Sequence, residues 1–590
     1  MSKTAPENSS TLGPPAGWAV AREPLHIAVL GWARLSLQAR EGSGYNLSAS
    51  ELAAGLALSG HKVSYLRSGM NYSLRPGMHV RKCERWRGVE CFDLYNSPNL
   101  SPAWSNFRNM AREQSSPDQT RLVLRWLDER GARVVHIHSL EGYSLDLIGA
   151  IRQSGRPVVI TPHNYWYLCP QVDLHHRELD CCTDYKGGQR CVDCVPHSVP
   201  ARRLRLKRRI EQTFYSVLGT FWAGLVRHAY MHLKWTATSL RDKLAGKVPQ
   251  TPQSMPPDPE LALGFEVDDA RSHPGTVSPS QPQDPNFEVP RIVPTRADEN
   301  ERFLRADHHL TVLNEYGRRR LAGIEAANHA SLIIPPSRFL LETMSAVGAN
   351  RELLRHVRLG QPHFDQLNRA ARRSPYYDRR PWDPSGPAPL RLAFLGTTRN
   401  NKGLEVVVRA IPLLSKAVRQ RCHFNIRAGG YDYPYRVRLA GFPEVSFGGG
   451  YDPANLVQIM GEFDVGLLPH IWFENSPLVM LEFLHAGKFI IASRLGGPPE
   501  WIVEPGRDHP GNGLLFAAGK AEELAHAITR LVNGEVAVPS AREVHEVSVL
   551  QSYPGHVREV ESIYATLLGR PPTDAPPPRE HARAPEFVAT

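Results

Sequence analysis

In residues 472–502, WFENSPLVMLEFLHAGKFIIASRLGGPPEWI, two acidic residues lie on either side of an expected helix start. Pro477 suits the first turn of a helix and Gly487 suits the position after its end, so the stretch predicts a loop, a helix and a strand. Glu474 then precedes the helix, and Glu482 lies in its second turn. Helix N-termini attract anions, and carboxylates accept hydrogen bonds from hydroxyl groups. The pattern favours a ligand with both phosphate and hydroxyl groups; the simpler alternative is two solvated charges beside a buried helix.

Length and composition indicate a globular chain with more than one domain. The 590 residues suggest about two to four domains, and a hydrophobic content of 41% supplies enough apolar surface for sizeable cores. The net charge of +11 favours an anionic partner and leaves nucleotide, anionic lipid and nucleic acid open. No apolar run is long enough to span a membrane and the N-terminus lacks a secretion signal, so we expect a cytoplasmic protein.

A glycine-containing loop lies in the first expected strand–loop–helix unit. Residues 25–31, LHIAVLG, predict a buried strand, and the loop with Gly42 and Gly44 leads into an expected helix at 46–59 and a strand at 61–66. Such a loop lets a phosphate or a sugar approach the backbone closely. A glycine loop of this length is as often a plain turn, so this signal alone is weak.

Three histidines lie near the ends of the next two expected strands, ARVVHIH and RPVVITP. Ligands of open α/β sheets bind at the carboxyl ends of the strands. A histidine near a strand end is more often structural, so we expect His136 and His138 to support the fold. His163 differs from them in that an aromatic run follows it directly.

Residues 169–197 form a cysteine-rich segment. Cys191 and Cys194 have the C-x-x-C spacing that lets two thiolates bind one tetrahedral zinc ion. Cys169 and Cys182 complete the expected set of four, and Cys181 and the histidines His175, His176 and His197 are alternative ligands. We expect a structural zinc site; the alternative is a group of free thiols in a surface loop.

Several segments outside the expected strands have biased compositions. Residues 202–235 combine a dense basic start with aromatic residues, which is typical of a helix that lies on an anionic membrane surface, although a core-packing helix with a solvated face is the alternative and nucleic acid is disfavoured. Residues 247–296 are rich in proline and are expected to be a disordered insertion. We also expect disorder in residues 1–23 and 570–590, and an interdomain linker at 371–389.

A second Rossmann-like domain is expected at residues 390–545, after a first domain at 24–370. It opens with LRLAFLGTTRNNKGLEVVV, in which a strand ends at Gly396 and Gly403 begins a helix. This arrangement suits a diphosphate, because glycine allows close approach, the helix start attracts anions and Lys402 supplies a cation. Residues 546–569 predict a final helix that crosses back to the first domain.

The sequence resembles retaining glycosyltransferases of the GT-B fold, family four (glycosyl transferases group 1). In that family an acid, seven residues and a second acid precede a Gly-Gly-x-x-Glu turn, and Glu474, Glu482, Gly496, Gly497 and Glu500 follow this order. The resemblance covers about residues 24–200 and 300–569. It implies an α/β fold of two Rossmann-like domains that face each other across a cleft.

The resemblance also implies a reaction. A sugar is transferred, with retained anomeric configuration, from a nucleotide-sugar donor to a glycan, lipid-linked or small-molecule acceptor in polysaccharide or glycoconjugate biosynthesis. The implied catalytic residues are His163, Lys402 and Glu474. The implied donor-binding residues are Gly42, Gly44, Gly396, Thr397, Arg399, Asn475, Ser476, Pro477, Leu478 and Glu482. The family usually has an arginine after the glycine where this chain has Thr397, and Arg399 is the expected substitute.

Other functions fit the sequence less well. Enzymes of this kind generally need no catalytic metal, and no acidic metal-binding triplet is evident. The two spaced acids disfavour an epimerase, and no free-phosphate site for a phosphorylase can be identified. A catalytically degenerate GT-B protein that acts as a zinc-containing interaction module is the non-enzymatic alternative, and a position at the inner face of the membrane remains open.

Overall fold

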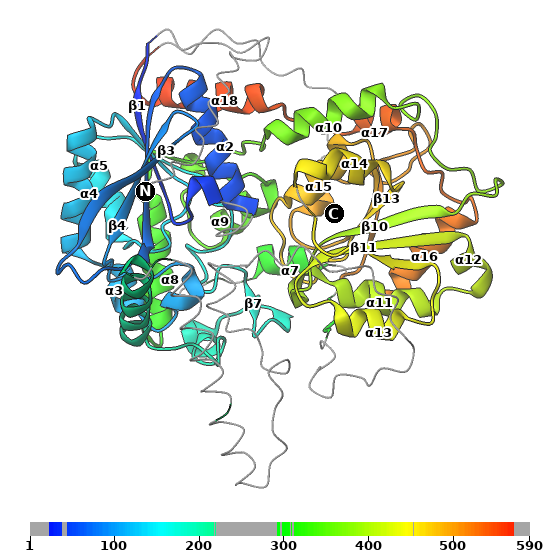
Figure 1. Cartoon of the computed structure of the whole chain (residues 1–590), viewed down its shortest axis with the longest axis horizontal. Coiled ribbons are helices and arrows are strands. Elements are labelled where there is room, and N and C mark those ends of the chain that lie inside the picture. The colour runs from blue at the N-terminus through cyan, green and yellow to red at the C-terminus, as the bar shows by residue number, and fades with distance from the viewer. Residues whose placement is uncertain are drawn as a thin grey trace.

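The computed structural model describes residues 23–37, 44–217, 219, 236, 292–295, 298–306, 308, 312–451 and 453–570. Gly42, most of the expected insertion at 247–296, the second half of the basic segment and nearly all of both expected disordered termini lie outside these residues. Figure 1 shows two lobes, each built on a sheet with helices on both faces.

The first sheet has seven strands in the order β3-β4-β2-β1-β5-β6-β9. β3 pairs antiparallel with β4, and the other pairings are parallel. The strands are β1 His26–Gly31, β2 Lys62–Asn71, β3 His79–Trp86, β4 Val89–Tyr95, β5 Val134–Ile137, β6 Val158–Ile160 and β9 Leu332–Ile333.

Alternation along β1 assigns its residues to two cores, because successive side chains of a strand point to opposite faces. Ala28 and Leu30 join one core with α4 Pro117–Arg130, α5 Asp146–Gln153 and α8 Glu315–Asn328. Ile27 and Val29 join the other core with α2 Gly44–Leu58 and α18 Tyr553–Leu567. Since both faces are covered, the strand is apolar throughout.

The second sheet has six parallel strands in the order β12-β11-β10-β13-β14-β15. The strands are β10 Leu390–Thr397, β11 Cys422–Gly429, β12 Val445–Phe447, β13 Val465–Leu468, β14 Phe489–Ser493 and β15 Gly513–Phe516. One face is covered by α11 Leu404–Leu413, α13 Tyr433–Leu439 and α16 Ala521–Val532. The other is covered by α10 Pro362–Arg373, α14 Leu456–Gly461 and α15 Leu478–His485. The two sheets confirm the predicted pair of Rossmann-like domains.

Two helices place the domain boundary more closely. α18, at the end of the described chain, packs against α2 of the first domain. α10 begins before the boundary expected at residue 370, yet it packs against α14 and α15 of the second domain. The chain therefore enters the second domain before α10 and leaves it before α18 (Figure 1).

The prediction of disorder over 247–296 is wrong for residues 292–295. Ile292 is 8% exposed in the core of the second domain, and the N–H group of Thr295 donates to the carbonyl oxygen of Ala518 at 2.9 Å. The proline-rich composition of the segment gave no indication that the Ile292 side chain packs on a distant part of the chain. The short helix α7, Glu299–Arg305, follows directly.

The remaining described elements are short, apart from a helix over 201–217 that continues the cysteine-rich segment. They are η1 Leu35–Leu37, η2 Ala103–Asn106, α3 Met110–Gln114, β7 His175–His176, β8 Asp180–Cys181, η3 Lys186–Cys191, α9 Arg338–Ala346, η6 Arg351–Leu353, η7 Asn400–Lys402, α12 Lys416–Gln420, η8 Pro453–Asn455, η9 Pro498–Glu500 and α17 Ala541–Val547.

Candidate donor-binding site

The loop between β10 and α11, residues 398–403, is called the phosphate loop below. It contains η7 and ends at Gly403, which has φ +74° and begins α11. A Cβ atom at Gly403 would lie 1.8 Å from the carbonyl oxygen of Pro469. Only glycine fits both this space and this backbone conformation. Gly403 therefore lets the loop pack closely against the residues that lead into the Glu474 stretch.

Lys402 and Glu474 meet although they lie 72 residues apart. Lys402 Nζ is 2.6 Å from Glu474 Oε2, and Trp472 Nε1 donates to the same oxygen at 3.0 Å. Lys402 Nζ also lies 5.3 Å from the centroid of the Trp472 ring. The Lys402 side chain is 35% exposed and that of Glu474 is 9% exposed. The pair thus joins a buried carboxylate to a cation that solvent reaches.

The Gly-Gly turn after β14 packs against the backbone of Glu474 and Asn475. A Cβ atom at Gly496 would lie 2.2 Å from the carbonyl oxygen of Glu474, and one at Gly497 would lie 1.9 Å from that of Asn475. The N–H group of Gly497 donates to the Glu474 carbonyl at 2.7 Å. Asn300, in α7, forms two hydrogen bonds of 2.7 Å with the backbone of Gly496. These contacts explain why the turn requires both glycines.

Asn475 connects the second domain to His163 of the first. Its Nδ2 donates to the carbonyl oxygen of His163 at 3.1 Å, and its Oδ1 accepts from the hydroxyl of Ser337. Nε2 of His163 is 2.9 Å from Nδ1 of His138, and the two rings are stacked. His163 follows β6 and therefore lies at the carboxyl end of the first sheet.

The three histidines form a chain of contacts. His136 Nε2 is 2.7 Å from Thr161 Oγ1, and its Nδ1 is 2.5 Å from the hydroxyl of Tyr564 in α18. Burial lowers the pKa of His136 and that of His163 to about 3, so both rings are neutral at pH 7. His136 fixes the terminal helix on the sheet, whereas His163 reaches the second domain.

Glu482 lies in α15, away from the Lys402–Glu474 pair. Its side chain is 7% exposed and its Oε1 is 3.1 Å from His363 Nε2 of α10. Its other oxygen, Oε2, is buried without a hydrogen-bond partner among the described residues. The charge of Glu482 and burial both raise the pKa of Tyr451. The buried oxygen is an acceptor that a ligand hydroxyl could satisfy.

The first helical turn of α2 faces that of α15. A Cβ atom at Gly44, the first residue of α2, would lie 3.1 Å from Cδ1 of Leu478, the first residue of α15. Pro477 precedes α15, and the buried hydroxyl of Ser476 lacks a partner within the described parts of the chain. Two helix N-termini, one from each domain, are thus brought close together, which favours an anion between them.

The structure thus brings together His163, Lys402, Glu474 and Asn475. Arg399 is exposed on the phosphate loop, whereas Gly396 and the exposed Thr397 are the last two residues of β10. Sequence reasoning missed the partners Trp472, Ser337, Asn300 and His363. Trp472 stands two residues before Glu474 and could have been found from that spacing, whereas the others lie more than 100 residues from the groups they contact.

Cys169, Cys182 and Cys191 line one small cavity with Tyr316 and Arg320. Burial raises the pKa of each of the four predicted zinc ligands, and neighbouring thiols add to the shift for Cys182, Cys191 and Cys194. Across the described residues, no three His, Cys, Asp or Glu side chains are arranged to hold one metal ion. The zinc site stays a prediction.

Nowhere in the described parts of the chain is there a helix with the length and apolar content needed to cross a bilayer. The predicted membrane contact of the basic segment concerns a surface helix and stays a prediction.

Two α/β domains with mainly parallel sheets, joined by α10 and α18 and contacting each other around Glu474, define the GT-B class. Residues 389–534 match the family model described as glycosyl transferases group 1, and residues 43–223 match the glycosyl transferase 4-like domain. Together with the two Rossmann-like domains, these matches identify the chain as a GT-B glycosyltransferase. No curated protein matches the sequence.

Solved structures with a similar chain course match most of the chain at low sequence identity. HepE from Anabaena, crystallised with UDP and glucose, is 12% identical with a TM-score of 0.46; the match covers 92% of this chain and 100% of HepE. Sucrose-phosphate synthase from Thermosynechococcus elongatus is 14% identical with a TM-score of 0.49, covering 92% and 99% of the two chains. The UDP-forming α,α-trehalose-phosphate synthase from Burkholderia xenovorans is 11% identical with a TM-score of 0.46, covering 92% and 100%.

Proposed function

We propose that the protein transfers a sugar, with retained anomeric configuration, from a nucleotide-sugar donor to a glycan, lipid-linked or small-molecule acceptor in polysaccharide or glycoconjugate biosynthesis. The observation that carries the proposal is the 2.6 Å contact between Lys402 and Glu474, with His163 held to the adjacent Asn475. A cation and a carboxylate thus meet near the contact between the two domains, where the backbone of His163 is held by Asn475.

Lys402 acts on the diphosphate of the donor. It lies on the phosphate loop before α11, which packs closely against Pro469 at Gly403. Its side chain is 35% exposed. Negative charge builds on the diphosphate as the sugar leaves, and a fixed cation stabilises that charge most in the transition state. Arg399 is exposed on the same loop and adds a second positive charge. These two cations supply the charge compensation that a catalytic metal would otherwise supply.

Glu474 and His163 act on the transferred sugar. A diphosphate competes with Glu474 for Lys402, which frees the Glu474 carboxylate to accept hydrogen bonds from sugar hydroxyl groups. The neutral ring of His163 has one donor and one acceptor nitrogen, of which Nε2 faces His138 at 2.9 Å. Trp472 holds Glu474 in place through its indole N–H group.

Glu482 and the start of α15 bind the nucleoside part of the donor. The buried and unpaired Oε2 of Glu482 suits a ribose hydroxyl. The backbone of Asn475, Ser476, Pro477 and Leu478 faces the donor, and Gly44 of the first domain approaches Leu478 from the opposite side. A residue at Gly44 with a side chain would narrow this space.

The test is a thermal-shift screen of UDP-, GDP-, ADP- and TDP-sugars, followed by detection of released nucleotide with and without candidate acceptors. One donor class is expected to raise Tm and to release nucleoside diphosphate slowly by hydrolysis. Stabilisation by a donor without any release or transfer would instead support the catalytically degenerate binding protein. No stabilisation by any of the four classes would contradict the proposed function.

A further inference from the structure

A hairpin inserted in the first domain contacts the phosphate loop of the second. The hairpin consists of β7, β8 and the turn between them, which contains Glu178. The carbonyl oxygen of Glu178 accepts a hydrogen bond from Asn400 Nδ2 at 2.7 Å. The thiol of Cys181 donates to the carbonyl oxygen of Ile471 at 3.8 Å. The hairpin therefore touches both the start of η7, which carries Lys402, and the residue before Trp472.

Asn400 lies at a point from which it can fix the position of Lys402. It begins η7, and its carbonyl oxygen accepts from the N–H group of Gly403 at 3.0 Å. On the inner side of the loop, the N–H group of Ile471 donates to the carbonyl oxygen of Asn401 at 3.0 Å. The loop is thus held by its own domain on one side and by the hairpin on the other.

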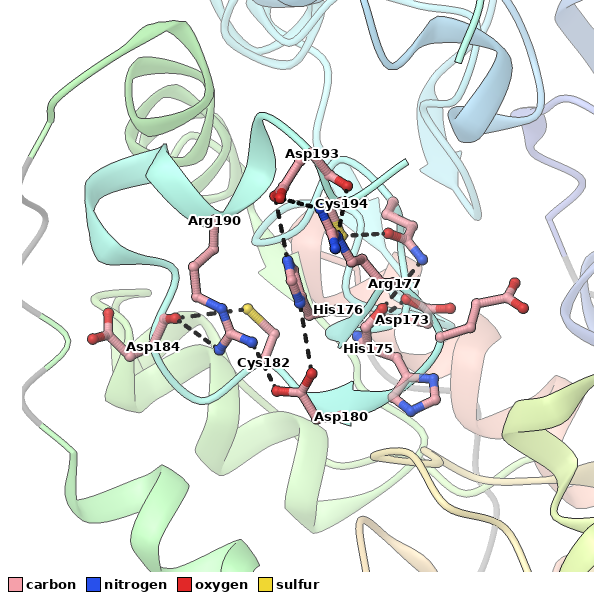
Figure 2. Close-up of polar contacts among 12 residues, drawn as sticks. Asp173, His175, His176, Arg177, Asp180, Cys182, Asp184, Arg190, Asp193 and Cys194 are labelled. Atoms are coloured by element: carbon pink, nitrogen blue, oxygen red, sulfur yellow. Dashed lines mark hydrogen bonds and ion pairs between the residues drawn. The ribbon is translucent and has the colours of Figure 1, made fainter. Parts of the chain in front are cut away.

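The hairpin is itself held by a network of charged side chains (Figure 2). His176 lies between Asp180 and Asp193, with each nitrogen–oxygen distance 3.6 Å. Arg190 Nη2 donates to Asp180 at 2.7 Å, and Arg177 pairs with Asp193. The segment is also anchored by Leu174 and Cys181, which are buried in the core of the first domain. The contact with Asn400 therefore comes from a fixed element.

Charge supports the same arrangement. Asp173, directly before the hairpin, is 9% exposed. Arg399 of the phosphate loop is close enough to interact with the charge of Asp173. The segment thus places an acidic group within reach of the exposed cation of the phosphate loop.

We propose that the β7–β8 hairpin is a positioning element of the donor site, in which the Glu178 carbonyl holds Asn400 and so fixes the loop that presents Lys402. Asn400 is a positioning residue, since it acts through Lys402. Its catalytic consequence rests on the proposed function, but its effect on the order of the loop does not. Because Glu178 and Asn400 belong to different domains, the hairpin also makes the phosphate loop sensitive to the separation of the domains.

Hydrogen exchange of the full chain, measured by mass spectrometry, tests the proposal with Asn400→Ala and Asn400→Gln. In Asn400→Ala, exchange in peptides spanning 400–403 should rise about fivefold, the effect of one net hydrogen bond. The affinity for UDP, used as the probe, should fall by a similar factor. Asn400→Gln keeps an amide donor and should recover part of both effects, which a general loss of stability would not.

Asn328→Ala is the matched control, because Asn328 Nδ2 also donates to a backbone carbonyl, that of Gly348 at 3.1 Å, but far from the phosphate loop in sequence. It should leave exchange at 400–403 and UDP affinity unchanged. Unchanged exchange in Asn400→Ala, or an equal rise in Asn328→Ala, would overturn the role of the hairpin. If the wild type binds no UDP or other nucleotide, the proposed function fails, and the exchange rates still decide on the hairpin.

Discussion

Lys402 and Glu474 form an ion pair whose geometry is better explained by function than by stability. One partner is 35% exposed, and solvent-exposed ion pairs contribute little to folding, about 0–1 kcal/mol. Trp472 also donates to Glu474 and lies beside the Lys402 ammonium group. Two polar groups hold one carboxylate next to the Gly-Gly turn, which fixes the position of the carboxylate, as the proposed catalytic role requires.

Replacing Lys402 with alanine should therefore reduce turnover much more than stability. We expect kcat to fall about a hundredfold or more, because the lost charge acts mainly in the transition state, while the donor Kd changes less. Steady-state kinetics with calorimetric donor binding measures both. Lys520→Ala removes a lysine from a surface ion pair of the same domain and should have wild-type kinetics. Near wild-type turnover in Lys402→Ala would contradict the proposed mechanism.

Glu482→Ala should show the opposite pattern. Its proposed contact with the ribose is remote from the reacting carbon, so donor affinity should fall about tenfold, as for a lost hydrogen bond to a charged group, with a smaller change in kcat. His363→Ala leaves the unpaired Oε2 in place and should have a weaker effect on affinity. If Glu482→Ala lowers kcat and leaves donor affinity intact, the assignment to the ribose is wrong.

At the scale of elements, the cysteine-rich segment offers a test for zinc. Burial raises the pKa of Cys169 and that of Cys194, and the backbone N–H groups of Gln171 and Leu174 near Cys169 and of Arg177 near Cys194 act in the opposite direction. We expect about one zinc ion per chain, as in a tetrahedral site, and its loss in the Cys191→Ser/Cys194→Ser variant.

Metal analysis of protein purified without a histidine tag measures the zinc content. Cys83→Ser alters an exposed cysteine outside the segment and should leave the metal content unchanged. An absence of stoichiometric zinc in the wild type would leave the four residues as free thiols.

One face of the helix over 201–217 packs against the first domain, and the opposite face is exposed. Ala201 and Leu204 are buried against Tyr72 and Leu100. On the other side, the apolar residues Leu206, Ile210 and Val217 are 56%, 59% and 75% exposed, beside the exposed Arg202 and Arg203. Apolar and basic side chains on one exposed face suit an anionic membrane surface.

The protein should therefore sediment with vesicles that contain anionic lipid at low salt and should be released as salt screens the attraction. The Leu206→Ser/Ile210→Ser variant should bind more weakly. Leu74→Ser, at an equally exposed position in a different segment, is the control and should bind like the wild type. Equal binding to neutral vesicles, or no binding to either kind, would remove the membrane contact.

For the whole molecule, the sequence predicted the domains well because their signals are local. Short apolar runs such as residues 25–31 favour buried strands, and Gly403 or Pro477 mark helix starts by their own conformational limits. The family resemblance implied separate roles for Lys402 and Glu474, but their ion pair was not predicted. The contacts of Asn300, Glu178 and residues 292–295 join segments far apart in the chain. No local hydrophobic periodicity or turn signal predicts such contacts. The contacts between the two domains therefore could not be predicted from the sequence.

Glu500 forms one of these interdomain contacts. Its two carboxylate oxygens accept from the N–H groups of Arg338 and Phe339, each at 3.0 Å, at the start of α9. The acid belongs to the second domain and the helix to the first. Burial raises the pKa of Glu500 to about 7, against the opposing effect of these hydrogen bonds. The folded protein thus binds this proton more tightly than the unfolded chain does.

A raised pKa of an acid has a defined consequence for stability. The folded state holds more protons than the unfolded state between about pH 4.5 and 7. The stability that protonation of Glu500 contributes is therefore fully present below that window and decreases as pH rises through it. Glu500→Gln cannot titrate, so it should lose this part of the pH dependence. Its Tm, taken relative to the wild type, should be a few degrees higher at pH 8 than at pH 5.

Thermal unfolding of the wild type and Glu500→Gln at the two pH values measures the effect. Glutamine also removes one hydrogen-bond acceptor at any pH. The test is therefore how the Tm difference between the two proteins changes from pH 5 to pH 8. Glu141 and Asp173, whose pKa values burial also raises to about 7, are present in both proteins and cancel. Glu522→Gln changes an exposed acid in the first turn of α16 and should show no such change. A Tm difference between Glu500→Gln and the wild type that is equal at pH 5 and pH 8 would show that Glu500 does not couple protonation to the contact between the domains.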